Sequence, residues 1–508
     1  MTTIPGLAES YWVDSTEATS YPSLSGETKV DVAVVGGGIA GLSAAWEVSG
    51  TGRSVAVLEA DRIVAGTTGY TTAKLTVQHG LIYEHLRATY GATAAQLYAQ
   101  SQTDAVEHVV NTAAELGIDC DLERRPAYTY VTSNGRVGEI EAEVDAARHA
   151  GLPASSATGT GLPFPVAAAI RVDGQAQFHP RRYLLALAGE LVRRGGRIYE
   201  RTRIVDLDEG EPCRLRAESG ATVTARDVVV ATHYPVFDRA LLFARLAPRR
   251  ELVVAGAIPA GADPDGMYLT SDPETRSVRT APYGNGQRLL IITGEPFQPG
   301  TPDIAKRLRR LADWTGDHFG VPTLAYHWAA QDTMTADRVP YVGPFHLGAR
   351  HVYVATGFNA WGMSSGVMAG RLLAALVDGG RPEWAGLYDP RRIHPVAEAG
   401  GFLRANLAVA RRFIGDRLRR SGPRSVREVP PGSGAVVRHH GQRYAVHRDD
   451  RGQLHAVSAT CTHLGCVVAF NDAERTWDCP CHGSRFSPDG AVLHGPATKP
   501  LEPREPPA

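Results

Sequence analysis

The residues best suited to chemistry lie near the end of the chain, in two short loops. Cys461 and His463 form a Cys-x-His pair, and Cys479 and His482 form a Cys-x-x-His pair. Two thiolates and two imidazoles divided in this way suit an unsymmetrical two-iron cluster, in which one iron binds both cysteines and the other binds both histidines. A tetrahedral zinc site could use the same side chains, but it does not need the second cysteine that each loop carries. The pattern therefore favours an iron–sulfur cluster over zinc.

The whole segment resembles the Rieske domains of the cytochrome bc1 and b6f type. The resemblance implies a disulfide between Cys466 and Cys481, which would join the two loops, and it places Gly495-Pro496-Ala497 over the cluster. Oxygenase-type Rieske domains lack this second cysteine pair, and nothing in the chain resembles their mononuclear iron domain with two histidines and one carboxylate. The family also implies that His463 and His482 face the surface, where electrons can leave towards a partner.

One residue departs from the high-potential members of the family. They have a tyrosine whose hydroxyl bonds a ligand sulfur at the position of Phe486, whereas Ser484 can still donate to a bridging sulfide. Hydrogen bonds to sulfur stabilise the reduced cluster, so their loss lowers the reduction potential. We therefore expect a potential below that of the respiratory complexes.

A glycine-rich turn lies between two short apolar segments in the amino-terminal part of the chain. Asp31–Val35 and Ser54–Leu58 have the character of buried parallel strands, and an amphipathic helix is expected between them. The turn follows the G-x-G-x-x-G pattern through Gly36, Gly38 and Gly41. Such glycines let a pyrophosphate approach the backbone at the helix amino end, and Glu59 can accept hydrogen bonds from ribose hydroxyls. The segment predicts a dinucleotide-binding domain.

The dinucleotide fingerprint occurs once, which argues against a second nucleotide domain for NAD(P)H. A later glycine-rich segment, Gly357–Gly366, precedes an expected helix whose amino end can stabilise negative charge on a reduced flavin. Together these segments resemble the D-amino-acid-oxidase-like family of FAD oxidoreductases, from about Tyr11 to Asp389, and within it the subgroup with an added Rieske domain. Besides the glycine turn and Glu59, the resemblance implies FAD contacts at Thr67, Thr68, Ile204, Thr232, Gly357, Gly362 and Met363.

The expected fold combines α/β and α+β parts. A discontinuous Rossmann-like FAD domain is expected over residues 28–95, 170–240 and 335–390, and a mixed-sheet substrate domain over 96–169 and 241–334. Residues 391–430 are expected to form a linker helix, followed by a small all-β Rieske domain over residues 431–508.

Composition narrows the range of partners. The chain has 508 residues and a formal net charge of −1, which argues against a nucleic-acid partner. It has no apolar run of the roughly eighteen residues that a membrane span needs, and no secretory signal, so a cytoplasmic location is expected. The amphipathic segment Gly401–Arg420 is expected to pack against a domain rather than to contact a membrane surface.

Two redox cofactors in one chain suggest that each carries out a different electron-transfer step. A flavin accepts two electrons as a hydride equivalent, whereas a two-iron cluster passes one electron at a time. We therefore expect an FAD-dependent dehydrogenase that oxidises a small organic substrate and passes electrons singly to an external acceptor protein. The family resemblance implies a CH–NH bond in an amine or amino acid. The alternatives are a direct flavin oxidase with a regulatory Rieske domain, and an electron-transfer module that takes electrons from a redox protein.

Residues that act on the substrate are harder to identify. Arg279 lies on an expected strand and is a candidate clamp for a carboxylate, while Gln331 and Asp332 lie in a stretch that the family runs beside the flavin. The family resemblance places Gly66–Lys74, the expected flavin loop, against the isoalloxazine, with Lys74 at its end. His79 is more simply a hydrogen-bonded local histidine than a base. No nucleophile–base pair is evident, and the cofactors can carry the difficult chemistry.

Overall fold

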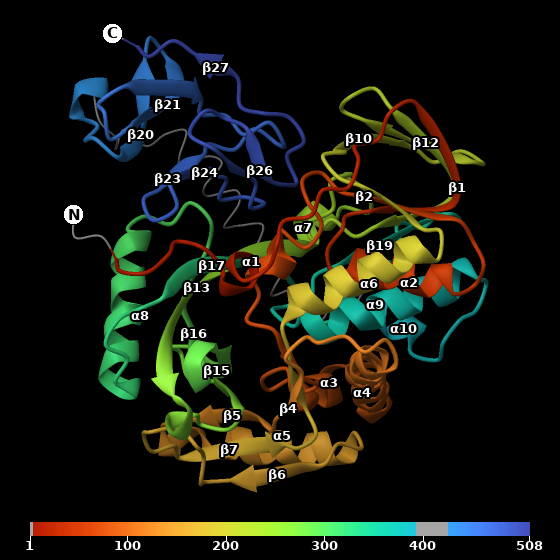
Figure 1. Cartoon of the computed structure of the whole chain (residues 1–508), viewed down its shortest axis with the longest axis vertical. Coiled ribbons are helices and arrows are strands. Elements are labelled where there is room, and N and C mark those ends of the chain that lie inside the picture. The colour runs from red at the N-terminus through yellow and green to blue at the C-terminus, as the bar shows by residue number, and fades with distance from the viewer. Residues whose placement is uncertain (1–3, 393–424, 508) are drawn as a thin grey trace.

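The computed structural model describes residues 4–392 and 425–507. Figure 1 shows two large sheets side by side, with a smaller β domain from the end of the chain beside them. This architecture confirms the expected combination of α/β and α+β folds with an all-β domain at the end. The expected linker helix at Gly401–Arg420 lies outside the described residues.

The first sheet has the strand order β10-β11-β12-β1-β2-β9, and β19 pairs with both β12 and β18. Its strands are β1 (Glu27–Val35), β2 (Val55–Leu58), β9 (Arg197–Tyr199), β10 (Ile204–Asp208), β11 (Cys213–Ala217), β12 (Thr222–Val230), β18 (Tyr341–Pro344) and β19 (Val352–Thr356). The central strands β2, β1, β12 and β19 run parallel, so their carboxyl ends meet at one edge. Ligands bind at this edge in open α/β sheets, because loops and helix amino ends converge there.

The second sheet is mixed, with the order β17-β13-β16-β15-β14-β5-β7-β6. Its strands are β5 (Ala127–Val131), β6 (Ala154–Ala157), β7 (Ala168–Val172), β13 (Leu246–Pro259), β14 (Met267–Thr270), β15 (Arg276–Tyr283), β16 (Gln287–Phe297) and β17 (Tyr326–Thr335). Strand β7 overlaps the second expected FAD segment, which begins at residue 170, but it pairs within this second sheet. A short sheet of β3 (Lys74–Leu75), β8 (Ala176–Gln177) and β4 (Glu123–Arg124) lies apart from both.

Helices cover the sheets and connect their strands. In the described residues they are α1 (Tyr11–Asp14), α2 (Ile39–Ser49), α3 (Tyr83–Tyr90), α4 (Ala92–Glu115), α5 (Val137–His149), α6 (Pro180–Arg193), α7 (Leu242–Arg245), α8 (Ile304–Phe319), α9 (Gly362–Val377) and α10 (Ala385–Tyr388). No helix in the part of the chain that the structure describes is long and apolar enough to cross a membrane.

The terminal β domain contains two four-stranded antiparallel sheets. One consists of β20 (Ser433–His439), β21 (Gln442–Arg448), β22 (Leu454–Ser458) and β27 (Pro503–Arg504), and the other of β23 (Ala469–Asn471), β24 (Thr476–Asp478), β25 (Arg485–Phe486) and β26 (Val492–His494). The proline-rich end of the chain therefore supplies an edge strand, and Leu501 before it is fully buried.

Two helices that are far apart in the sequence, α2 and α9, touch at their backbones. A Cβ atom on Gly366 would lie 2.7 Å from Cγ2 of Ile39, and one on Gly370 would lie 2.5 Å from Cβ of Ser43. Glycine at these two positions allows the close approach. The contact sets the amino ends of both helices near the carboxyl edge of the first sheet.

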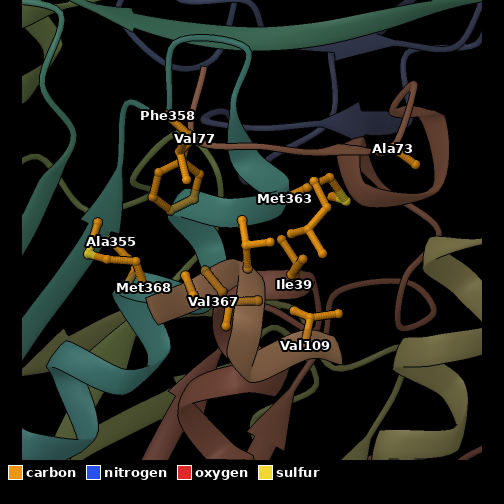
Figure 2. Close-up of a cluster of buried hydrophobic side chains, with 14 of the residues drawn as sticks. Ile39, Ala73, Val77, Val109, Ala355, Phe358, Met363, Val367 and Met368 are labelled. Carbon is orange, nitrogen blue, oxygen red and sulfur yellow. The ribbon is translucent and has the colours of Figure 1, made fainter. Parts of the chain in front are cut away.

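Apolar side chains fill the space around this helix pair. Figure 2 shows Ile39 of α2 beside Val367 and Met363 of α9, with Val109 of α4 and Phe358 at the margins. These side chains are buried, and each contributes apolar surface that folding removes from water. The core thus holds the dinucleotide edge of the sheet rigid.

Replacing Gly370 with alanine should lower the free energy of unfolding by about 1–3 kcal/mol, as overpacking typically does. Gly189 in α6 is the matched control, because nothing lies within 4 Å of its Cβ position. Alanine at residue 189 should be neutral or stabilise the protein by roughly 0.5–1 kcal/mol, since alanine favours helix. Thermal unfolding followed by circular dichroism measures both variants. Equal effects would contradict close packing of α2 on α9.

Candidate functional site

The dinucleotide turn leaves no room for side chains. Gly36 has φ +108°, and a Cβ atom there would overlap the carbonyl oxygen of Ala231. A Cβ atom on Gly41 would overlap the carbonyl oxygen of Gly36. The backbone of the turn is therefore bare beside the amino end of α2, which is the cradle that a pyrophosphate requires.

Glu59 holds this turn in place from the end of β2. Its Oε2 accepts a hydrogen bond from the N–H of Gly37 at 2.7 Å, and its Oε1 accepts one from the N–H of Asp61 at 3.0 Å. Burial raises the pKa of the Glu59 carboxyl, although both N–H groups oppose this shift. The carboxylate lines the cavity next to the turn, where it can also accept hydrogen bonds from a ribose.

A cavity of about 960 Å³ extends from the glycine turn to the second sheet. Its lining includes these expected FAD contacts: Gly36, Gly38, Glu59, Thr67, Thr68, Ile204, Thr232, Gly362 and Met363. Gly41 and Gly357 do not line it; Gly41 packs against the turn, and Gly357 lies against Thr335. Gln331 and Asp332 of β17 line the same cavity. The residues present therefore fit FAD, and the same cavity extends to residues of the second sheet.

Arg279 does not reach this cavity. Its guanidinium donates hydrogen bonds to the carbonyl oxygens of Thr72 at 3.1 Å, Ala73 at 2.8 Å and Thr280 at 3.0 Å. The residue is 1% exposed, and burial lowers its pKa to about 9. Because its donors already bind backbone oxygens, the structure does not support the expected carboxylate clamp. Arg279 instead fastens the flavin loop to β15.

Lys74 is buried and lines the cavity. Its Nζ donates to the carbonyl oxygen of Tyr268 at 2.6 Å and to the hydroxyl of Ser277. Burial, together with the neighbouring Arg279 guanidinium, lowers the pKa of this ammonium to about 7. His79 is different, because its ring nitrogens bind Tyr98 and nearby oxygens, and burial lowers its pKa to about 3.

The two cysteine–histidine loops come together in the terminal domain. Cys466 and Cys481 form a disulfide between them, as the family resemblance implied. Cys461 and Cys479 are free and buried, and their thiols share a hydrogen bond that lowers the pKa of Cys461 and raises that of Cys479. The sulfur atoms of Cys466, Cys479 and Cys481 also lie within 4.8 Å of one another. Two of these three are committed to the disulfide, so they do not form a metal site.

Two buried imidazole nitrogens complete the donor set. Nδ1 of His463 and Nδ1 of His482 have no hydrogen-bond partner among the described residues. A buried nitrogen without a partner is costly, unless it binds a metal. These two nitrogens and the two free thiols fit the four ligands of an unsymmetrical [2Fe–2S] cluster.

Ser484 and Phe486 border the cluster loops. The Oγ of Ser484 accepts a hydrogen bond from the N–H of Ala497 at 3.0 Å, which leaves its O–H to donate to the cluster side. Phe486 is fully buried in β25 and offers no hydroxyl. The structure thus supports one of the two side-chain hydrogen bonds of the high-potential proteins.

The expectation that the histidine ligands face the surface is wrong. The side chain of His463 is 7% exposed, with its Nε2 3.3 Å from Oδ1 of Asp238, and His482 is 3% exposed. The ring of His482 lies 5.9 Å from that of Tyr234 and 6.2 Å from that of Phe243. These covering residues follow β12 in the first-sheet domain, so packing between the domains removes the histidines from solvent.

Further residues cross the same domain boundary. Nε2 of Gln331, on β17, donates to the carbonyl oxygen of Gly483 at 3.0 Å. Nε2 of His494 lies 3.3 Å from Nδ1 of His233, and Nε2 of His233 lies 3.6 Å from Oδ1 of Asp332. His233, Gln331, Asp332 and His494 all line the cavity, so the flavin and cluster regions share a wall.

Sequence reasoning missed several of these residues. His233 could have been noticed because it directly follows Thr232, at the carboxyl edge of a parallel strand. Neither Tyr234 nor His494 carries a comparable local signal. Arg338 is exposed, lines the cavity, and forms no side-chain hydrogen bond or ion pair with the residues that the structure describes. Arg338 follows Asp332 by six residues, in the stretch that the family resemblance places beside the flavin, but the sequence alone does not single out its side chain.

Replacing Phe486 with tyrosine should raise the reduction potential of the cluster by roughly 20–60 mV. A net hydrogen bond contributes about 0.5–1.5 kcal/mol, and a tenfold change in equilibrium corresponds to about 59 mV for one electron. A redox titration followed by EPR measures the shift. Phe470→Tyr, on β23 of the same domain, is the control and should leave the potential unchanged. A shift of equal size in both variants would contradict a hydroxyl-specific effect.

Comparisons with known proteins agree with this geometry. A family model described as FAD dependent oxidoreductase matches residues 31–376, and one described as Rieske [2Fe-2S] domain matches residues 424–504. The Rieske 2Fe-2S iron-sulfur protein YhfW of Bacillus subtilis is 36% identical over 499 residues, covering 97% of each chain. Gamma-glutamylputrescine oxidoreductase of Escherichia coli is 24% identical over 392 residues, covering 73% of this chain and 88% of that protein.

A solved structure shows the same fold in the larger part of the chain. The crystal structure of glycine oxidase from Geobacillus kaustophilus matches with a TM-score of 0.60 at 21% identity, covering 72% of this chain and all of that one. The fold, the glycine turn and the cluster loops of the structure thus agree with the family models and the solved structure. The chain belongs to the FAD-dependent oxidoreductase family and carries, after that domain, a Rieske domain for a [2Fe–2S] cluster.

Proposed function

We propose that the protein is a dehydrogenase that oxidises the CH–NH bond of an amine or amino acid and passes the electrons singly through its Rieske cluster to an external acceptor. The observation that carries the proposal is the shared cavity wall. Val492, Leu493, His494, Gly495 and Thr498 of the Rieske domain line the same cavity as the dinucleotide turn. A redox domain built into the flavin cavity supports transfer between the two centres over a direct oxidase with a detached regulatory domain.

Relatives support the class of substrate. One relative is named for gamma-glutamylputrescine and one solved neighbour for glycine, and both compounds contain a carbon–nitrogen bond of the kind proposed. When bound, FAD would supply a hydride acceptor and the cluster a one-electron carrier. The residues of the chain then have to bind the substrate, keep its amine neutral and exclude water.

The protein offers groups for these tasks beneath the second sheet. Asp332 and Glu251 line the cavity and can bind an ammonium group as it enters. Lys74 lines the same region, and its pKa of about 7 allows Nζ to hold or release a proton near neutral pH. Because hydride leaves more readily from a neutral amine, a neutral Lys74 would assist by accepting the substrate proton.

Arg338 fits a carboxylate better than Arg279 does. Its guanidinium has no partner among the described residues, and it lines the same cavity as Asn359 and Trp361. An unpaired guanidinium in a cavity is well suited to bidentate binding of a carboxylate. We therefore propose Arg338 as the anchor for amino-acid substrates.

An anaerobic substrate screen tests the proposed reaction. Amino acids and secondary amines are mixed with the holoenzyme, flavin bleaching is followed optically, and the reduced cluster is measured by EPR. We expect one compound to reduce both centres. Bleaching with an oxidised cluster would support a direct oxidase instead. Reduction only by dithionite or a reduced ferredoxin would overturn the amine assignment and support an electron-transfer module.

Replacing Arg338 with methionine should raise KM for a carboxylate substrate by roughly 10- to 150-fold, because a hydrogen bond to a charged group contributes about 1.5–3 kcal/mol. The matched control is an amine without a carboxylate, whose KM should not change. Arg338→Lys should restore part of the affinity. Steady-state kinetics with an artificial electron acceptor measures KM for the carboxylate substrate and for the amine without a carboxylate. An equal loss with both substrates would show that Arg338 does not bind the carboxylate.

A further inference from the structure

We propose that the side of the Rieske domain that carries His463 and His482, here called the histidine face, is stably docked on the FAD domain. The Rieske domain thereby forms a fixed wall of the flavin cavity. This docked arrangement does not depend on which substrate the flavin oxidises. It also limits where an external redox partner can bind. Because the FAD domain covers the histidines, the partner would have to approach the cluster from another side.

Aromatic packing covers the histidine face. Tyr234 is 2% exposed and its ring lies 5.9 Å from that of His482 and 6.5 Å from that of His463. The ring of Phe243 closes the same face from α7. Aromatic side chains stabilise an interface through large apolar contact area as well as ring geometry. Opening this face would expose rings that are now out of water.

A buried charge network fastens the two domains next to this face. Arg250 of β13 is 1% exposed, and its guanidinium binds the carboxylate of Glu474 and lies 3.4 Å from Oδ2 of Asp478. Arg485 of the Rieske domain binds the same two carboxylates. Separating the domains would break the charge-assisted hydrogen bonds between Arg250 and these two carboxylates. The network therefore resists movement of the Rieske domain.

Close backbone contacts fix the cluster loop itself. Gly483 directly follows His482 in the second loop, and a Cβ atom on it would be 2.7 Å from Nε2 of Gln331. Nε2 of Gln298 donates to the carbonyl oxygen of Pro480 at 3.1 Å. On the other side of the loop, His494 contacts His233. The loop that carries Cys479 and His482 is thus held from both large domains.

These contacts also explain why the cavity includes Rieske residues. The segment Val492–Gly495 reaches the cavity beside Arg203 and Val236 of the first-sheet domain. Arg203 donates to the carbonyl oxygen of Val492 at 3.4 Å. The docked domain therefore forms part of the wall of the flavin cavity, and weakening its contacts should speed the release of FAD.

Chemical modification of the holoenzyme tests the docking. Diethyl pyrocarbonate modifies accessible imidazoles, and peptide mass spectrometry measures the rate at each histidine. His463 and His482 should react about tenfold or more slowly than an exposed histidine, because modification has to wait for local opening. His149, whose side chain is 67% exposed, is the internal reference. Modification of His463 and His482 at the rate of His149 would overturn the proposal.

Two variants outside the cavity lining should open the face. Glu474→Ala removes the carboxylate between Arg250 and Arg485, and Gln298→Trp wedges a large side chain against Pro480. Both should speed the modification of His463 and His482 and the release of FAD, with the rate at His149 unchanged. Glu141→Ala, at an exposed position of α5, is the matched control.

The two variants weaken the docking contacts in different ways, so one can replace the other in the test. Gln298→Trp leaves the buried charges intact, so it remains informative if Glu474→Ala fails to fold. FAD release is followed by the recovery of free flavin fluorescence, which does not depend on turnover. Faster release without faster modification would overturn the link between docking and the cavity. Unchanged protection in both variants would show that these contacts do not hold the face closed.

Discussion

The arrangement of the whole molecule depends on how one buried cation is neutralised. Arg250 lies on β13, next to the edge strand of the second sheet, almost without exposure, and its carboxylate partners come from the Rieske domain. A charge in such a position is tolerated only when it is paired and hydrogen-bonded. The sheet over the flavin cavity and the cluster domain are therefore not independent bodies, because each supplies charges that the other needs.

The cofactor regions form where rigid elements end. The parallel strands of the first sheet and the amino ends of α2 and α9 converge on one edge, and the backbone contact of the two helices holds that edge fixed. The second sheet covers the far end of the cavity, where polar side chains such as Lys74 and Asp332 lie. Preorganised groups of this kind bind and orient a substrate without having to rearrange.

The Rieske domain has the ligand pattern of its family, but its two ligand histidines are buried instead of facing the surface. Two orphaned imidazole nitrogens and two free thiols are ready to bind iron, and the disulfide joins the loops that carry them. The histidines lie against Tyr234 and Asp238 rather than solvent. Burial and the missing hydroxyl at Phe486 both bear on the reduction potential, since solvent exposure and hydrogen bonds to sulfur tune it.

The sequence by itself determined what depends on short spacing. The cluster ligands lie in two neighbouring loops, and Glu59 follows the glycine turn after one helix and one strand, so the order of residue types already implied their chemistry. Tertiary structure decided the rest. Arg279 binds backbone carbonyls while Arg338 reaches the cavity, and His233 meets His494 across 261 positions. Such contacts form only when folded domains bring distant side chains together, and burial then selects which polar groups are paired and which stay available to a ligand.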